Sequence, residues 1–209
     1  LLASQGHASA ITNSEELKTF RVLFDTIRDV TSYHSSPFSA SELTVFRKFL
    51  NWPTEHILPI MDAFRVLMMH HQANQSMGGD EQLHQLLFDH VKAGKAAGKD
   101  THQILMLKIV ANWIAKRQRA SSERSEPASV PEPVLNYIKR TLSELSDAAQ
   151  SENENLALAY VMLLHNLICW YGRLKIASSD LYSLVANGVV TLLTSRPRNS
   201  KIQFYALLA

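Results

Sequence analysis

The stretch of sequence that decides the fold is residues 103–113, which read Gln-Ile-Leu-Met-Leu-Lys-Ile-Val-Ala-Asn-Trp. Apolar side chains recur in it at steps of three and four residues and cover most faces of a helix. This pattern is typical of a helix with neighbours on several sides. Residues 156–171 show the same pattern. We therefore expect two long helices at the centre of a helical core.

Shorter stretches with a single apolar stripe surround these two. We expect their helices at residues 14–30, 39–50, 59–71, 80–93, 134–149, 179–194 and from 199 onwards. Residues 73–79 are expected to form a loop. Residues 116–133 are charged and rich in Ser and Pro, which predicts a mobile loop between packed parts. The chain has only 7 Gly and 7 Pro, too few for the many turns of an all-β protein.

The expected helices recur at a regular interval. The first helices of successive pairs begin near residues 14, 59, 101, 152 and 199, about 42 to 51 residues apart, which is close to the length of armadillo and HEAT repeats. We therefore predict an all-α fold, an armadillo/HEAT-like helical-repeat stack (α-solenoid) over residues 14–209, preceded by a disordered leader at residues 1–13. Leu1 is not a methionine and the apolar stretch 204–208 has no polar tail, so we expect the chain to be part of a longer protein.

Composition excludes several classes of partner. The formal net charge is only +2, too small for the general electrostatic footprint of a nucleic-acid-binding protein. No apolar stretch reaches the roughly 18 to 20 residues of a membrane span. We therefore expect neither a nucleic acid nor a membrane as partner, and a location in the cytoplasm and/or nucleus. The single cysteine, Cys169, excludes an internal disulfide, and its apolar surroundings predict a buried thiol.

The sequence lacks the common catalytic signatures. It contains no Gly-x-Ser-x-Gly, no His-Glu-x-x-His and no Cys-x-x-Cys, which excludes the usual hydrolase and zinc motifs. The histidines include the pair His70 and His71 and the pair His84 and His90. Neither spacing lets both rings face one ion on a helix, so we expect these rings at solvated edges. The prediction is a chain that is not an enzyme and holds no metal or cofactor.

Four polar residues interrupt the apolar helical stretches. Asn112 and Asn166 stand where an aliphatic side chain would be typical. Each amide either satisfies a backbone group of a neighbouring helix or belongs to a row of amides that holds an extended peptide. Arg65 and Lys108 are lone cations in such stretches. Either their stems are buried while the charges reach solvent, or both charges line a groove for carboxylates.

Three segments resemble motifs of one known family, the PUL domain, found at the carboxyl end of phospholipase A-two activating protein and its fungal counterparts. Leu58–Arg65, preceded by Pro53–Glu55, is similar to the Pro-rich opening and Asp-x-x-Arg helix of that domain. Gln103–Asn112 resembles its Gln-x-x-x-Leu-Arg-x-x-x-Asn helix. Asn153–Leu156, followed by Asn166, resembles its Asn-x-Asn segment. The order and approximate spacing of the three segments agree with the family.

The resemblance implies an armadillo-like bundle that binds the acidic, aromatic C-terminal tail of the hexameric AAA ATPase valosin-containing protein, and through it the ubiquitin machinery. By the resemblance, Arg65 keeps a cation of the family, and Lys108 replaces an Arg. Phe204 and Tyr205 stand where the family has an aromatic residue and an Arg, so one cation is missing. The implied partner-binding residues are Arg65, Lys108, Asn112, Asn166 and Tyr205.

The first hypothesis is therefore a non-catalytic adaptor that binds an acidic peptide. Two alternatives remain open. PUL-like domains also occur beside thioredoxin or thiol-peptidase modules, so the chain could be an auxiliary domain of such a protein. It could also be a helical scaffold for some other protein partner.

Overall fold

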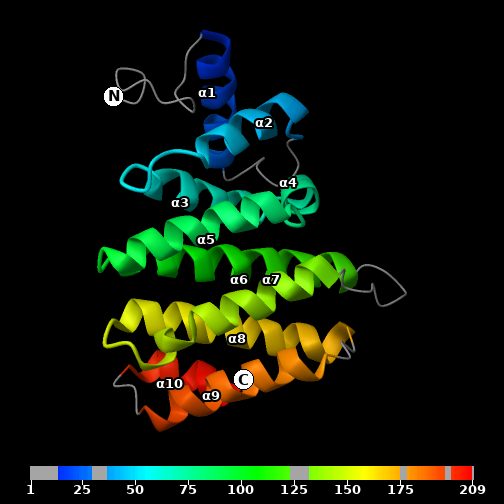
Figure 1. Ribbon diagram of the computed structural model, residues 1–209. Helices are drawn as coiled ribbons and strands as arrows, with labels where there is room; N and C mark the ends of the chain where they lie inside the picture. Colours follow the sequence, from blue (N-terminus) through cyan, green and yellow to red (C-terminus); the bar gives the residue numbers. More distant parts are fainter. Residues whose placement is uncertain (1–13, 30–36, 123–131, 175–177, 196–198, 209) are drawn as a thin grey trace.

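A computed structural model describes residues 14–29, 37–122, 132–174, 178–195 and 199–208 of the chain. All regular secondary structure in this part is helical (Figure 1). In chain order, the elements are α1 (Ser14–Arg28), α2 (Ala40–Phe49), α3 (Leu58–Leu67), α4 (His71–Met77), α5 (Glu81–Ala96), α6 (Asp100–Ser122), α7 (Glu132–Glu144), the short 3₁₀ helix η2 (Ser146–Gln150), α8 (Glu154–Leu174), α9 (Ser179–Thr194) and α10 (Ser200–Leu208). The predicted all-α helical stack is confirmed.

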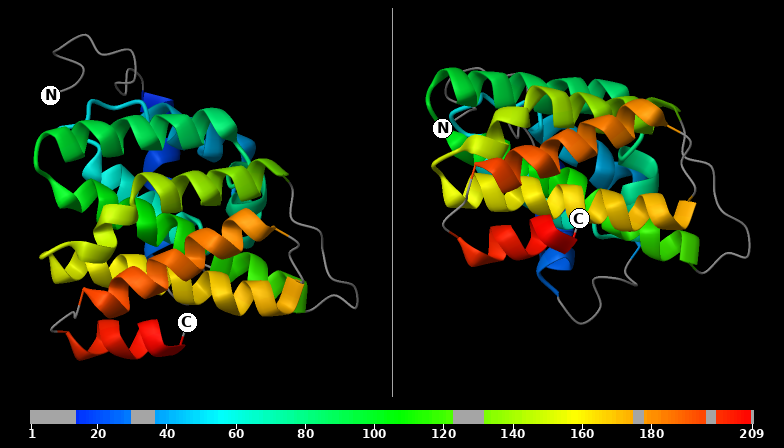
Figure 2. Two further views of the ribbon diagram at one scale, coloured as in Figure 1. Left: turned by 60° about the horizontal axis from the view of Figure 1, so that its bottom comes forward. Right: turned by 90° about the horizontal axis from the view of Figure 1, so that it is seen from below.

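The long helices form two layers. In one layer α3, α6, α8 and α10 pack against one another in succession. Helices α5, α7 and α9 form the second layer, with α5 packed on α6 and α9 packed on α8 and α10. The two views of Figure 2 show this second layer on the same side of α6, α8 and α10. The helices of the first layer therefore have one side that is turned away from α5, α7 and α9.

Helices of the first layer run parallel to one another. The side-chain amide of Asn153 donates to the Asp100 carboxylate near the beginnings of α8 and α6, and that of Asn166 donates to the Ala111 carbonyl further along both helices. These partners lie 53 and 55 residues apart in the sequence. Between α3 and α6 the hydrogen-bonded residues are 47 apart, and between α8 and α10 they are 45 apart. The offsets of 45 and 47 residues agree with the roughly 40–47 residues of an armadillo or HEAT repeat, and those of 53 and 55 residues are longer.

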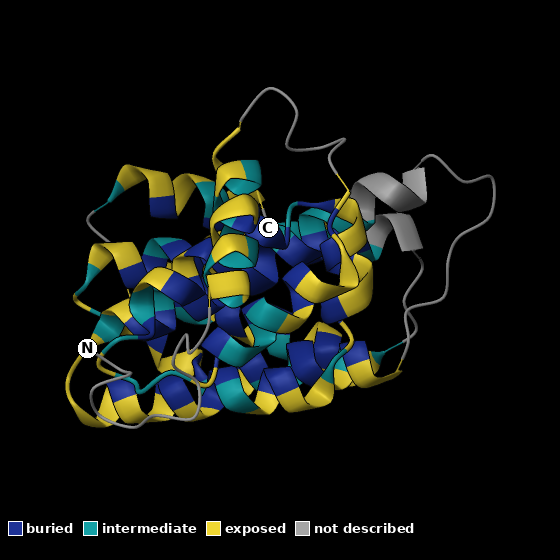
Figure 3. Ribbon diagram, turned by 90° about the horizontal axis from the view of Figure 1, so that it is seen from above, coloured by how far each residue is buried: buried dark blue, intermediate teal, exposed yellow. Residues whose placement is uncertain are grey.

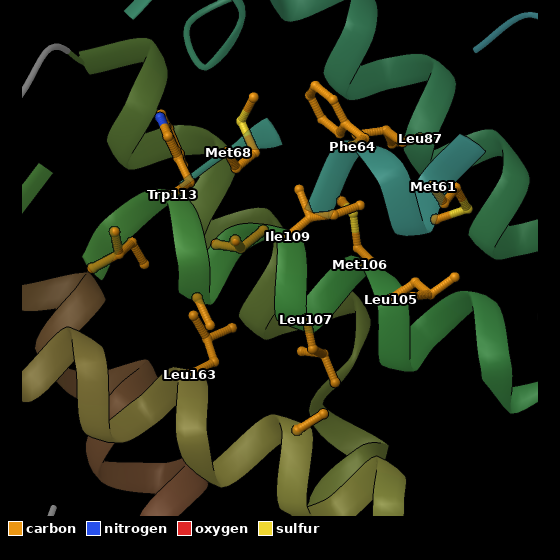
Figure 4. Close-up of a cluster of buried hydrophobic side chains, with 14 of the residues drawn as sticks. Met61, Phe64, Met68, Leu87, Leu105, Met106, Leu107, Ile109, Trp113 and Leu163 are labelled. Carbon is orange, nitrogen blue, oxygen red and sulfur yellow. The ribbon is translucent and has the colours of Figure 1, made fainter. Parts of the chain in front are cut away.

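Helix α6 lies at the centre of the core, as its sequence predicts. Its Met106 and Leu107 are completely buried. Figure 4 shows Phe64 of α3, Leu87 of α5 and Leu163 of α8 in the apolar cluster around it. Burying one side chain of this size stabilises the fold by about 1.5–3 kcal/mol. Figure 3, coloured by burial, shows that the buried residues gather where helices meet.

Local signals in the sequence fix several helix ends. Before α2, the Ser39 hydroxyl accepts a hydrogen bond from the Glu42 backbone N–H, and the Glu42 carboxylate accepts one from the Ser39 backbone N–H, which is a capping box. The Asp80 carboxylate accepts from the Leu83 N–H at 3.1 Å and caps α5. Shortly after α5, Gly98 has a φ of 66°, a left-handed conformation that glycine adopts without strain.

One expected loop is wrong. Residues 71–77 form α4, whereas we expected a loop at 73–79. Ala73 and Met77 are buried on one side of this helix. The amide of Asn74 donates to the carbonyls of Met68 and Trp113 at 2.8 and 3.1 Å. The helix is too short to show an apolar period, and its stability comes from these tertiary contacts.

The expected loop at 116–133 is shorter at both ends. Helix α6 continues to Ser122, and α7 begins at Glu132. Residues 116–120 read Lys-Arg-Gln-Arg-Ala, all good helix formers, so the helix extends past its apolar part. Residues 123–131 and the expected leader 1–13 lie outside the described residues.

Candidate functional site

The side of the first layer that is turned away from α5, α7 and α9 carries the residues singled out in the sequence. Exposed residues recur there every two helical turns, at Thr101 and Lys108 in α6 and at Asn155, Met162 and Cys169 in α8. Residues seven apart lie on the same side of a helix. We call this surface the open face, and define it by the exposed or half-buried residues Arg65, Lys108, Asn112, Met162, Asn166, Lys201 and Tyr205.

Arg65 of α3 is held at the open face by a local ion pair. Its Nε donates to a carboxylate oxygen of Asp62 at 2.7 Å, and the Arg65 side chain remains 31% exposed. An exposed pair of this kind contributes only about 0–1 kcal/mol. A guanidinium has five N–H donors, of which this contact uses one. The ion pair therefore positions the cation without burying it.

Asn112 and Asn166 tie the parallel helices together. The Asn112 amide of α6 donates to the Arg65 carbonyl of α3 at 2.8 Å. The Asn166 amide of α8 donates to the Ala111 carbonyl of α6 at 3.1 Å. The first of the two alternatives, an amide that satisfies a neighbouring helix, is therefore what the structure contains. Both side chains are only half-buried, so contact with a bound peptide stays a prediction.

These hydrogen bonds also set Arg65, Asn112 and Asn166 in one row across three helices. Lys108 lies one turn before Asn112 in α6 and is exposed. Its charge reaches solvent although its neighbours in α6 are buried. Arg65 and Lys108 thus lie on one side of the layer rather than on opposite sides.

Tyr205 of α10 joins the same surface. Its ring lies 5.6 Å from the ring of His165, the residue before Asn166 in α8. The structure therefore brings all five residues predicted from the sequence to the open face. It adds two that were missed, namely Met162, which is 41% exposed, and Lys201, which is exposed in the first turn of α10. Lys201 lies four residues before Tyr205, but a lysine in the first turn of a helix is an ordinary surface residue, so the sequence alone does not single it out.

Cys169 is exposed, so the predicted buried thiol is wrong. Its sulfur lies 3.7 Å from Nε2 of His165, four residues earlier in α8. Helix α8 is apolar on most sides, and the pattern alone does not show which narrow stripe meets solvent. That stripe includes Met162 and Cys169, which are both exposed.

The prediction of solvated histidines is confirmed for His71, which is exposed, and wrong for His70, His84 and His90, which are buried. The ring nitrogens of His90 lie 3.0 Å from the Thr54 hydroxyl and 2.9 Å from the Leu50 carbonyl. These hydrogen bonds hold the segment before α3 against α5. A ring with two polar atoms joins buried segments in this way. Among the described residues, no group of three or more His, Cys, Asp or Glu is placed to bind a metal ion.

A cleft of about 540 Å³ lies on the other layer, between α5 and α7. His84, one of its lining residues, stacks on Tyr137 with ring centroids 3.5 Å apart. Burial lowers the pKa of His84 from 6.5 to about 4, so this ring is uncharged at neutral pH. The guanidinium of Arg140 lies 4.0 Å from the Phe88 ring centroid and pairs with Glu144 at 2.7 Å. Its guanidinium therefore already has a carboxylate partner within the molecule.

Among the described residues, no helix is both long and apolar enough to span a membrane. Comparisons of the sequence with curated proteins and with solved structures found no match. The family model of the PUL domain, a protein-interaction module, matches residues 1–209. The match covers the helices of both layers and every residue of the open face, and so this chain belongs to the PUL domain family.

Proposed function

We propose that this chain is a non-catalytic adaptor whose open face binds the acidic C-terminal tail of the AAA ATPase valosin-containing protein. The observation that carries the proposal is the row of Arg65, Asn112 and Asn166 across three parallel helices, with Lys108 one turn away. Cations and amides side by side on an accessible surface are the complement of an extended acidic peptide.

Each part of the open face has a task in this proposal. Arg65 and Lys108 attract carboxylates and pair with them. The carboxamides of Asn112 and Asn166 offer a donor and an acceptor to the peptide backbone. Tyr205, beside His165, offers an apolar and aromatic contact to an aromatic side chain of the tail.

The proposed role is one of binding alone, and it needs no cofactor. The adaptor acts in the cytoplasm and/or nucleus, where it connects the ATPase to the ubiquitin machinery. Since the net charge of the whole chain is only +2, the attraction depends on local cations, and it weakens as added salt screens them.

The test is isothermal titration calorimetry with a synthetic peptide of the ATPase tail. Arg65→Glu reverses the charge in the row and sets a second carboxylate beside Asp62, so we expect the affinity to fall at least about tenfold. Lys92→Glu, on the exposed side of α5 in the other layer, makes the same charge change and is the matched control. Circular dichroism checks that both variants fold. Equal affinity of the two variants for the tail would contradict the proposal.

The cleft between α5 and α7 favours a second candidate function, a scaffold for another protein. It has a volume of about 540 Å³ and is lined by Pro133 and Tyr137 together with polar residues. A partner bound there would be lost on Asn136→Trp, which fills the cleft, and kept in Arg65→Glu. Cross-linking and pull-down with both variants separate this function from the first.

A further inference from the structure

Lys201 is the third exposed cation of the open face, and nothing so far gives it a role. We infer that Lys108 and Lys201 form two charge contacts on either side of α8. The peptide that fits them has acidic side chains about five to six residues apart, with an apolar side chain between them. This inference rests on the proposed binding of an acidic tail. It specifies the spacing of acidic side chains in the peptide that the open face binds.

The first step is the register between α6 and α8. Hydrogen bonds join Asp100 to Asn153 and Ala111 to Asn166, at offsets of 53 and 55 residues. Because the helices are parallel, a residue of α6 lies beside the residue of α8 about 54 positions later. Lys108 is therefore level with the exposed Met162.

The second step is the register between α8 and α10. The Asn199 amide donates to the Glu154 carboxylate at 3.0 Å, just before α10 begins. Further along, the rings of His165 and Tyr205 lie 5.6 Å apart. Interpolation between these contacts sets Lys201 about one helical turn before the level of Met162. The two lysines thus lie on opposite flanks of α8.

The third step is the distance that a ligand must cover. Helices in contact have axes about 8–10 Å apart, so two steps from α6 to α10 span about 16–20 Å. One turn along the helices adds an offset of about 5 Å, which lengthens the path only slightly. An extended peptide advances about 3.3–3.6 Å per residue, so about five to six residues cover the path.

The fourth step is the chemistry between the two lysines. From Asn155 to Cys169, α8 contains no Asp, Glu, Lys or Arg. Met162 is the large apolar side chain that this stretch exposes, at 41%. The face is therefore positive at α6 and at α10 and uncharged over this part of α8, where Met162 is the exposed large apolar side chain. This order favours a ligand in which an apolar residue separates two acidic positions.

By the family resemblance, an Arg is expected where this chain has Phe204 and Tyr205. Lys201 supplies a positive charge near that position. Residues four apart in a helix lie on the same side, so Lys201 and Tyr205 share one flank of α10. Tyr205 is half-buried against α8, whereas Lys201 is exposed. A positive charge is thus present one turn earlier in the helix.

The first test measures binding of the ATPase tail peptide to Lys201→Glu by calorimetry, with Lys92→Glu as the matched control. We expect Lys201→Glu and Lys108→Glu each to lower the affinity roughly tenfold, because both changes remove a charge contact and add a repulsion. Lys201→Arg keeps the charge and should bind like the unchanged chain. If Lys201→Glu binds as tightly as Lys92→Glu, while Lys108→Glu binds weakly, the inference is wrong and the proposed function stands.

The second test uses a series of Ser/Gly peptides with two Glu-Glu pairs, a central Leu, and spacers of about two, five or ten residues. Fluorescence anisotropy should show tightest binding with the middle spacer, and Lys201→Glu should abolish the preference. Affinity that does not depend on the spacer overturns the inference. If the middle peptide binds with this preference but the ATPase tail does not bind at all, the proposed function fails and the spacing rule stands.

Discussion

Asn74 and Asn112 make similar hydrogen bonds in two regions of the molecule that differ in access to water. Asn74 of α4 is 2% exposed, and its amide donates to two carbonyls, those of Met68 and Trp113. Asn112 of α6 is half-buried, and its amide donates to one carbonyl, that of Arg65. An amide enclosed in the core serves the fold alone. An amide in the open face serves the fold and is still accessible to a partner.

The contrast between the buried Asn74 and the half-buried Asn112 predicts that Asn74→Ala has the largest effect on the unfolding free energy. This change leaves two enclosed carbonyls without their donor and opens a small cavity, so we expect a loss of about 3–4 kcal/mol in unfolding free energy. Urea denaturation followed by circular dichroism measures it. A loss below that of Asn112→Ala would contradict the distinction between the two regions.

A pH effect of nearly that size is expected from His84 of α5, whose buried ring packs against Trp113 of α6. Burial lowers the pKa of His84 to about 4, while the unfolded chain takes up this proton near the ordinary value of 6.5. The stability from the neutral ring is complete above about pH 6.5 and is lost as the pH falls towards 4, by on the order of 3 kcal/mol in total. Burial also lowers the pKa of His90, which acts in the same direction.

Urea denaturation at about pH 7.5 and pH 4.5 measures this loss. His84→Phe keeps a ring against Tyr137 and removes the titrating group, so the variant should lose less stability over the same range. Identical pH dependence in the two proteins would show that His84 does not cause the loss.

For the buried core around α6, the sequence predicts the burial of apolar side chains better than the burial of polar ones. The periodicity of residues 103–113 correctly indicates a central helix, because apolar side chains on most faces require neighbours on most faces. The burial of His84 and His90 is not predicted, because a histidine is buried only where other segments supply partners for its nitrogens. Those partners, such as the Leu50 carbonyl, are about 40 residues away in the sequence.

The open face is predicted in its residues but not in its layout. Asn112 and Asn166 are conspicuous because each interrupts an apolar stretch, and the repeat spacing indicates that they occupy corresponding positions. Lys201 is not conspicuous, because a lysine in the first turn of a helix is an ordinary surface residue. Only the contact of Tyr205 with His165 shows that α10 continues the same surface.

A smaller effect is expected for Asn112→Ala. Water reaches the half-buried site and replaces the amide at the Arg65 carbonyl, so we expect a loss of about 1 kcal/mol in unfolding free energy. The tail peptide should also bind more weakly, because the amide is part of the proposed row. Denaturation and calorimetry on the same preparation measure both. A loss as large as that of Asn74→Ala would show that the row belongs to the enclosed core.

The smallest effect on stability is expected for Lys108→Ala. The side chain is exposed and alanine is a good helix former, so the unfolding free energy should change by less than about 0.5 kcal/mol. Tail affinity should nevertheless fall about three- to tenfold at low salt, and the difference from the unchanged chain should shrink as salt is added. The open face would then differ from the buried core around Asn74, because its cation contributes to binding and not to folding. If Lys108→Ala lowers stability and leaves affinity unchanged, its stem is part of the packing and its charge has no partner.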